Sequence, residues 1–194
     1  FCDCPNLKEV VLNEGLEELG TDECPDDGRM CHGVFDGVFR GVFERSAVKR
    51  VALPSTLKVI EYSAFNECKN LTHVQLPDGL EKIGARCFYE SGLEEVSFPD
   101  SMKEVGVEAF KGCEQLRDVR LNDGLEKLGE EVVIQGYSYT GGVFVRCAFE
   151  SIRLPPAIRR LERYTFCGCK RLKSIDIQNG VEYVGRECFS GSGL

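Results

Sequence analysis

The stretch that decides the fold runs from Leu71 to Phe88 and reads LTHVQLPDGLEKIGARCF. Its first six residues follow the pattern Leu-x-x-Val-x-Leu, whose second half alternates apolar and polar residues, as a strand with one buried face does. Pro-Asp-Gly follows and favours a turn, and the apolar pair Leu80 and Ile83 indicates a second short extended segment. Gly84 then begins a short turn or 3₁₀ piece that ends on Phe88. The stretch therefore predicts two short strands joined by tight turns.

This pattern recurs along the chain with a period of 22 or 23 residues. A phenylalanine marks the end of each unit, at Phe1, Phe43, Phe65, Phe88, Phe110, Phe144, Phe166 and Phe189. Two intervals exceed the period and indicate insertions near residues 21–40 and 130–142. We expect one array of eight repeats over residues 1–194 and, because neither end shows a polar cap, a segment of a longer array. A unit this short cannot bury its apolar face alone, so the units must stack into a solenoid of short parallel strands and turns.

Charged residues alternate in sign from one repeat to the next. The position after the first apolar residue of the second segment holds, in chain order, Glu17, Lys58, Glu81, Lys103, Glu126, Arg159 and Glu182. Neighbouring strands lie about 4.7–4.9 Å apart, so each acid is expected to have a base on either side. We interpret the pattern as a solvated ladder that holds register, each exposed pair contributing under about 1 kcal/mol.

Composition and motifs argue against several classes of function. The 194 residues carry a formal net charge of −8, which disfavours a nucleic-acid binder, and no apolar run approaches the roughly 18 residues of a membrane span. No nucleophile elbow, phosphate-binding loop, metalloprotease motif or dinucleotide fingerprint occurs, and the carboxylates lie in repeated columns opposite bases. We therefore expect no catalysis, no cofactor, no small-molecule substrate, no nucleic-acid partner and no direct membrane insertion.

Two sets among the eleven cysteines matter most. One set follows the marker phenylalanine by three residues in alternate repeats: Cys4, Cys68, Cys113 and Cys169. Alternate repeats are about 10 Å apart, too far for disulfides, so we expect small buried apolar side chains there. Cys24 and Cys31 lie in the first insertion, where a local disulfide between them is plausible. A zinc site built from these two with Cys2 and His32 has no standard ligand spacing, so we expect no metal site.

The repeats resemble the BspA-type leucine-rich repeat, whose consensus is similar to L-x-x-[IV]-x-[LI]-P-x-x-[LV]-x-x-I-G-x-x-A-F-x-x-C-x-x-L. Residues 71–88 match this consensus nearly throughout, and residues 63–71 and 108–116 carry its A-F-x-x-C-x-x-L half. The repeat lengths and the alternating charges look closest to the protist and algal members. The resemblance implies a right-handed leucine-rich-repeat solenoid that binds protein, since members are mostly surface or secreted proteins implicated in adhesion. It favours secretion or the cell surface, and leaves an organellar or cytoplasmic assembly open.

Solenoids bind through an extended face and through insertions that project from it. The second insertion reads as a hairpin with residues 132–134 as one arm, and we predict that Tyr137 and Tyr139 on the other arm contact a partner. Phe35 and Phe39 are expected to do the same in the first insertion, which should leave the same edge about 20 Å away. The alternative is that both insertions cover the solenoid locally and bind nothing.

A further pair, Arg120 and Arg153, occupies adjacent repeats of one strand column and could bind a small anion. Asp176 in the next repeat favours a structural salt ladder instead. Taken together, the sequence predicts a non-catalytic protein–protein interaction module used for adhesion or ligand display. The alternative is a scaffold-like accessory subunit docked on a large protein assembly, membrane-associated or not.

Overall fold

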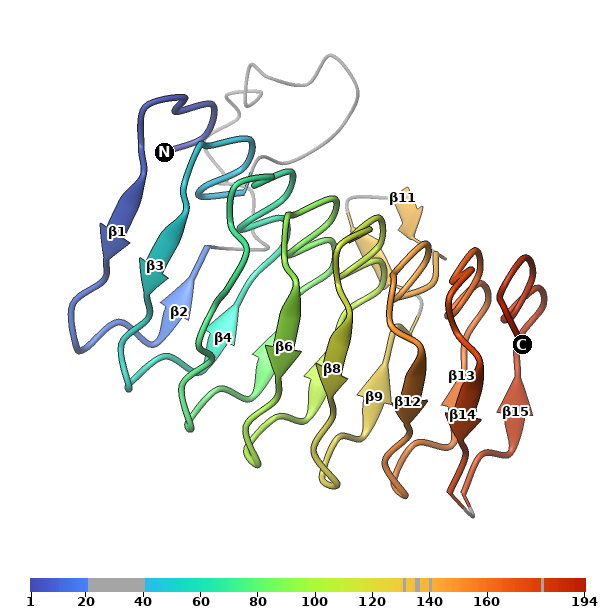
Figure 1. Ribbon diagram of the computed structural model, residues 1–194. Coiled ribbons are helices and arrows are strands. Elements are labelled where there is room, and N and C mark those ends of the chain that lie inside the picture. The colour runs from blue at the N-terminus through green and yellow to red at the C-terminus, as the bar shows by residue number, and fades with distance from the viewer. Residues whose placement is uncertain (21–40, 131, 135–136, 140, 179) are drawn as a thin grey trace.

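The chain winds into a β-solenoid whose strands form two rows, with the N- and C-terminal ends at opposite ends of the array (Figure 1). The structure is a computed structural model that describes residues 1–20, 41–130, 132–134, 137–139, 141–178 and 180–194. The strands that pair within each row do so in parallel, which confirms the predicted fold class. In the described part of the chain, no helix has the length and apolar character needed to cross a membrane.

Each row collects the strands of one half of the repeat. The first row consists of β1 (Glu9–Val11), β3 (Arg50–Ala52), β6 (Glu95–Ser97), β8 (Asp118–Arg120), β12 (Ser151–Arg153) and β14 (Ser174–Asp176). The second row consists of β2 (Glu18–Leu19), β4 (Val59–Ile60), β5 (Lys82–Ile83), β7 (Glu104–Val105), β9 (Lys127–Leu128), β13 (Arg160–Leu161) and β15 (Tyr183–Val184). From β2 to β9 the second row is one continuous sheet, whereas the first row is divided into the pairs β1-β3, β6-β8 and β12-β14.

Residues 71–77 are not a strand, although the sequence predicts one there. Val74 and Leu76 are buried, so the expected alternation of buried and exposed side chains is present. Among the described residues, however, no backbone hydrogen bond joins this segment to β3, and on its other side only the Glu94 N–H donates to the Thr72 carbonyl, at 3.0 Å. Alternation predicts which side chains are buried, but a ladder also needs the neighbouring strand at pairing distance.

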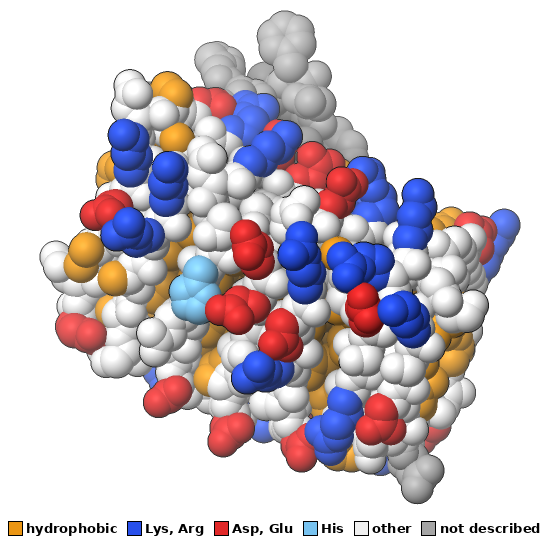
Figure 2. All heavy atoms as spheres, viewed as in Figure 1, with side chains coloured by type: hydrophobic (Ala, Val, Ile, Leu, Met, Phe, Trp, Pro, Cys, Tyr) orange, Lys and Arg blue, Asp and Glu red, His pale blue; other side chains and the backbone are white. Residues whose placement is uncertain are grey.

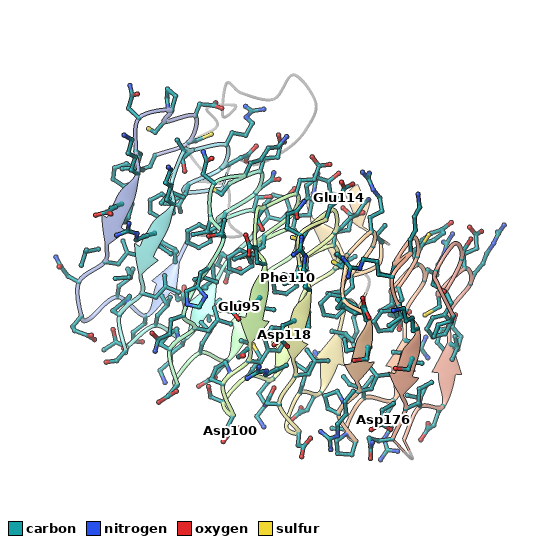
Figure 3. All side chains as sticks on the ribbon, in the orientation of Figure 1. Glu95, Asp100, Phe110, Glu114, Asp118 and Asp176 are labelled. Atoms are coloured by element: carbon teal, nitrogen blue, oxygen red, sulfur yellow. The ribbon has the colours of Figure 1, made fainter. Side chains whose placement is uncertain are left out.

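A stack of phenylalanine rings forms the centre of the core. The marker phenylalanines of successive turns lie face to face, with centroids 5.3–5.9 Å apart and planes inclined by 4–17°. Phe110, labelled in Figure 3, is fully buried, whereas Phe1 at the end of the stack is 70% exposed. Because each ring packs on the turn before it and the turn after it, the period seen in the sequence is a packing period of the core.

The segment that contains each marker phenylalanine is a run of single turns, the first of the two predicted alternatives, and not a 3₁₀ piece. The Asn66 N–H donates to the Ser63 carbonyl at 3.0 Å, and the Cys68 N–H donates to the Phe65 carbonyl at 3.2 Å. Ser63 and Glu67 have positive φ angles of 52° and 54°. A 3₁₀ helix needs consecutive residues with negative φ, so the left-handed residues interrupt it.

Candidate partner-binding edge

Both insertions leave the solenoid at the same point of a turn. Gly20 follows Leu19 of β2 and Gly129 follows Leu128 of β9, and their φ angles are 98° and 75°. Gly84, at the same point of a turn without an insertion, lies outside this left-handed region. Glycine adopts positive φ without strain, so it can turn the chain out of the solenoid at both places.

Both insertions also return to the solenoid on a glycine. A Cβ on Gly41 would lie 1.7 Å from the carbonyl oxygen of Ser63, and one on Gly142 would lie 2.0 Å from that of Tyr164. Turns without an insertion hold a larger residue with positive φ at this position, such as Arg86 with 55°. The role of these glycines was not predicted from the sequence, although a glycine flanks each insertion on both sides and could have indicated it.

The second insertion contains the hairpin β10–β11, formed by Val132–Ile134 and Tyr137–Tyr139. The two strands pair antiparallel, with Val132 opposite Tyr139 and Ile134 opposite Tyr137, so the predicted hairpin is confirmed at the level of the backbone. Five residues that the sequence singled out in the first insertion lie outside the described residues: Cys24, Cys31, His32, Phe35 and Phe39.

A partly buried cluster of charges lies where the second insertion rejoins the solenoid. Glu108 accepts a hydrogen bond from Lys111 Nζ at 2.7 Å, and its other oxygen lies 3.5 Å from Arg86 Nε. The Arg86 guanidinium lies over the ring of Tyr89, 4.3 Å from its centroid. A Cβ on Gly141 would lie 2.0 Å from Glu108 Oε1, so backbone and carboxylate are in close contact. The sequence did not predict this cluster, because its members come from two successive turns.

The alternating charges on the second row pair in one direction only. Each of three bases lies 3.6 Å from the acid of the following turn: Lys58 from Glu81, Lys103 from Glu126, and Arg159 from Glu182. The backbone places a base on either side of Glu81, as expected, since the Glu81 N–H donates to the Lys58 carbonyl at 2.8 Å and the Lys103 N–H donates to the Glu81 carbonyl at 2.9 Å. Among the described residues, however, no ion pair joins these bases to the acid of the preceding turn. The ladder repeats every two turns, and it organises this face without forming a site.

Arg120 and Arg153 lie on the first row, the face seen in Figure 2, where acidic and basic side chains are interspersed. Arg120 donates to Asp118 at 2.9 Å, and Arg153 donates to Asp123 at 2.5 Å. Hydrogen bonds to these carboxylates raise the pKa of both guanidinium groups above their usual range. Asp176 is in register with Arg153 across β12 and β14 (Figure 3). Since each guanidinium has a carboxylate partner, this geometry agrees with the salt ladder that the sequence favours over an anion site.

Cysteines of consecutive turns form a buried column. Cys113, Cys147 and Cys169 each donate through Sγ to the carbonyl oxygen of a marker phenylalanine, at 2.9–3.2 Å. They are free thiols, and burial raises the pKa of Cys113 and of Cys169 to about 12. Thiols with so high a pKa are not nucleophiles near neutral pH, so the column is part of the core. Within the described ranges, no group of three or more His, Cys, Asp or Glu residues could hold a metal ion.

Comparison with known proteins agrees with this architecture. A family model described as the BspA type leucine rich repeat region, in six copies, matches residues 38–139 and 137–194. A leucine-rich repeat protein from Bacteroides ovatus superposes with a TM-score of 0.78 at 25% identity, covering 100% of this chain and 43% of that one. The leucine-rich repeat protein of T. pallidum superposes with a TM-score of 0.68 at 27% identity, covering 95% of this chain and 76% of that one. The chain thus spans less than half of the Bacteroides protein, and no curated protein sequence matches it.

Proposed function

Because the chain belongs to the BspA-type leucine-rich repeat family, we propose that it is a non-catalytic protein–protein interaction module that serves adhesion or ligand display. Leucine-rich-repeat solenoids are generally non-catalytic, and their fold serves protein–protein interaction or cell-surface roles. The partner is a protein, bound through the edge from which the two insertions leave.

The observation that carries this proposal is the equivalence of the two insertion junctions. Gly20 and Gly129 turn the chain out at the same point of two turns, and Gly41 and Gly142 bring it back at the same point. The four turns between the junctions span about 20 Å at the strand spacing of a sheet. Two insertions that leave one edge at this separation can contact one partner together, which a single loop could not do.

The body of the solenoid supports such an edge because it is stiff. The continuous phenylalanine stack and the five-stranded sheet from β2 to β9 connect the two junctions. A rigid support lowers the entropy that is lost when loops bind, so loops on a stiff scaffold bind better than free loops.

The proposal is tested by shortening the second insertion without changing the turn beneath it. Replacing residues 130–141 by a single valine joins Gly129 to Gly142 through one residue, as Val107 joins Gly106 to Glu108 in an uninterrupted turn. Native affinity capture at low salt then compares this variant with the wild-type protein. We expect the amount of captured partner to fall at least tenfold, while the midpoint of thermal unfolding of the variant stays equal to that of the wild type.

A matched pair of point variants tests whether the hairpin itself contacts the partner or whether removing any exposed tyrosine weakens capture. Tyr137→Ser changes the hairpin, whereas Tyr183→Ser changes a 41% exposed tyrosine on β15, away from the edge. If Tyr137→Ser loses the partner and Tyr183→Ser keeps it, the result supports binding through the insertion edge. Undiminished capture by the shortened protein would overturn the proposal, and a stoichiometric partner that survives high salt would favour an accessory subunit of an assembly over adhesion.

A further inference from the structure

A hollow of roughly 1230 Å³ lies over the N-terminal end of the first row, on the face seen in Figure 2. It is lined by β1, by β3 and by residues of the 69–78 segment, and its central residues are apolar. Val11 is 76% exposed there, Ala52 is exposed beside it, and Val51 is only half-buried. In the neighbouring pair β6-β8 the equivalent inward-facing residue, Val96, is 2% exposed. This hollow therefore offers apolar surface that the rest of the row keeps covered.

The hollow coincides with the break in the first row. The Arg50 N–H donates to the Lys8 carbonyl at 3.2 Å and the Leu12 N–H donates to the Ala52 carbonyl at 3.0 Å, so these residues of β3 face β1. Backbone groups alternate along a strand, so the N–H and carbonyl of Val51 face the other way, toward residues 72–76. No backbone hydrogen bond crosses to those residues within the described chain. Polar backbone groups and apolar side chains thus meet in one hollow.

Charges separate to the two ends of the hollow. Lys49 and Lys69 precede the parallel segments that line it, and both are exposed. Glu14 and Asp78 follow those segments at the opposite end, where Ser55 holds Glu14 through its hydroxyl at 2.9 Å and its N–H at 3.1 Å. These hydrogen bonds lower the pKa of Glu14, which keeps it ionised. One end of the hollow is basic and the other is acidic.

We propose that this hollow binds an extended peptide segment of the partner protein, acidic at the end beside Lys49 and Lys69, apolar in its centre and basic at the end beside Glu14 and Asp78. The inference rests on the proposed interaction function. It adds a second contact surface, the hollow, and states the chemistry of the peptide that this surface would bind. About five residues of extended chain span the length of β3 and its flanks. An extended segment matches the hollow because its own backbone can pair with unpaired groups such as those of Val51.

The balance of charge argues against a nucleic acid as the occupant. The other charged pair in the hollow, Arg50 with Glu9, forms an ion pair at 3.1 Å, so the lining acids offset the lining bases. A phosphate backbone needs an excess of bases along its whole path. A peptide with opposite charges at its two ends meets a complementary group at each end.

The test selects random heptapeptides displayed on phage against the whole protein. We expect the enriched peptides to share one acidic end, an apolar centre and one basic end. With the double variant Lys49→Glu and Lys69→Glu, the acidic end of the enriched peptides should become basic. Ala52→Glu places a charge in the apolar centre and should reduce binding of the wild-type peptides at least tenfold.

A matched control is Ser174→Glu, which places the same charge on an exposed residue of β14 at the other end of the first row. It should leave peptide binding unchanged. Enriched peptides without this polarity, peptides unaffected by the two lysine reversals, or no enrichment would each overturn the inference. The proposed function is judged separately, since the hairpin variants of the capture experiment leave the hollow intact.

Discussion

Phe110→Ala tests whether the phenylalanine stack holds the solenoid together. Phe110 is fully buried, and its ring lies 5.4 Å from that of Phe88, 5.7 Å from that of Phe144 and 6.0 Å from that of Phe98. Removing a buried phenylalanine side chain from a core costs about 3–5 kcal/mol. Because Phe110 loses ring contacts on both sides, we expect a loss near the middle of that range, about 4 kcal/mol.

Phe110 lies in the middle of the array, so its loss should also change how cooperatively the solenoid unfolds. Turns of a solenoid contact only their neighbours, so a weak turn in the middle lets the two halves unfold separately. Urea titration followed by far-ultraviolet circular dichroism should therefore show a broader transition for Phe110→Ala, with a lower midpoint. The chain has no tryptophan, so circular dichroism is a better probe than intrinsic fluorescence.

Phe1→Ala is the matched control for this experiment. Phe1 is 70% exposed, and among the described residues its ring stacks only on that of Phe43, at 5.5 Å. Its loss should cost under about 1 kcal/mol, because little of the side chain leaves water on folding. Equal losses for the two variants, or a loss under about 1.5 kcal/mol for Phe110→Ala, would refute the view that the stack is the main support of the core.

Three further predictions concern charges and thiols. A double-mutant cycle on Lys103 and Glu126 should give a coupling under about 1 kcal/mol that disappears in 1 M salt, because the pair is exposed at 3.6 Å. Cys113 should resist thiol reagents in the native protein at pH 8 and react only on unfolding, as mass spectrometry can show, because burial raises its pKa to about 12. Hydrogen bonds from Arg171 and Lys173 lower the pKa of Glu150 to about 2, so its contribution to stability is complete above about pH 4.5 and is lost as the pH falls toward 2. Thermal unfolding of Glu150→Gln should lack that part of the acid dependence, and an unchanged acid profile would contradict the prediction.

The parts of the fold that depend on periodicity could be predicted from the sequence. The interval between marker phenylalanines gave the stacking of turns, and the alternation at Val74 and Leu76 gave their burial. Periodicity works because identical positions in successive turns meet the same neighbours. The hairpin in the second insertion was predictable for a related reason, since a short apolar run and a turn lie next to each other in the chain.

The features that depend on local geometry between two turns could not be predicted. The missing backbone pairing beside Val51 and the one-directional ion pairing of Lys103 with Glu126 both depend on how individual groups are oriented, which no repeat pattern records. The contact between Glu108 and the chain at Gly141 joins a turn to an insertion of irregular length. The break beside Val51 and the contact at Gly141 belong to the candidate binding surfaces, so these surfaces were harder to predict than the core.

The central claim is that the edge carrying the insertions contacts a protein partner. The most direct measurement replaces Tyr137 with a photo-crosslinking phenylalanine derivative, irradiates the protein during affinity capture and identifies the attached polypeptide by mass spectrometry. The same substitution at Tyr183 on β15 is the control. We expect one discrete crosslinked product from Tyr137 and none from Tyr183. A product from Tyr183 with none from Tyr137 would contradict the central claim.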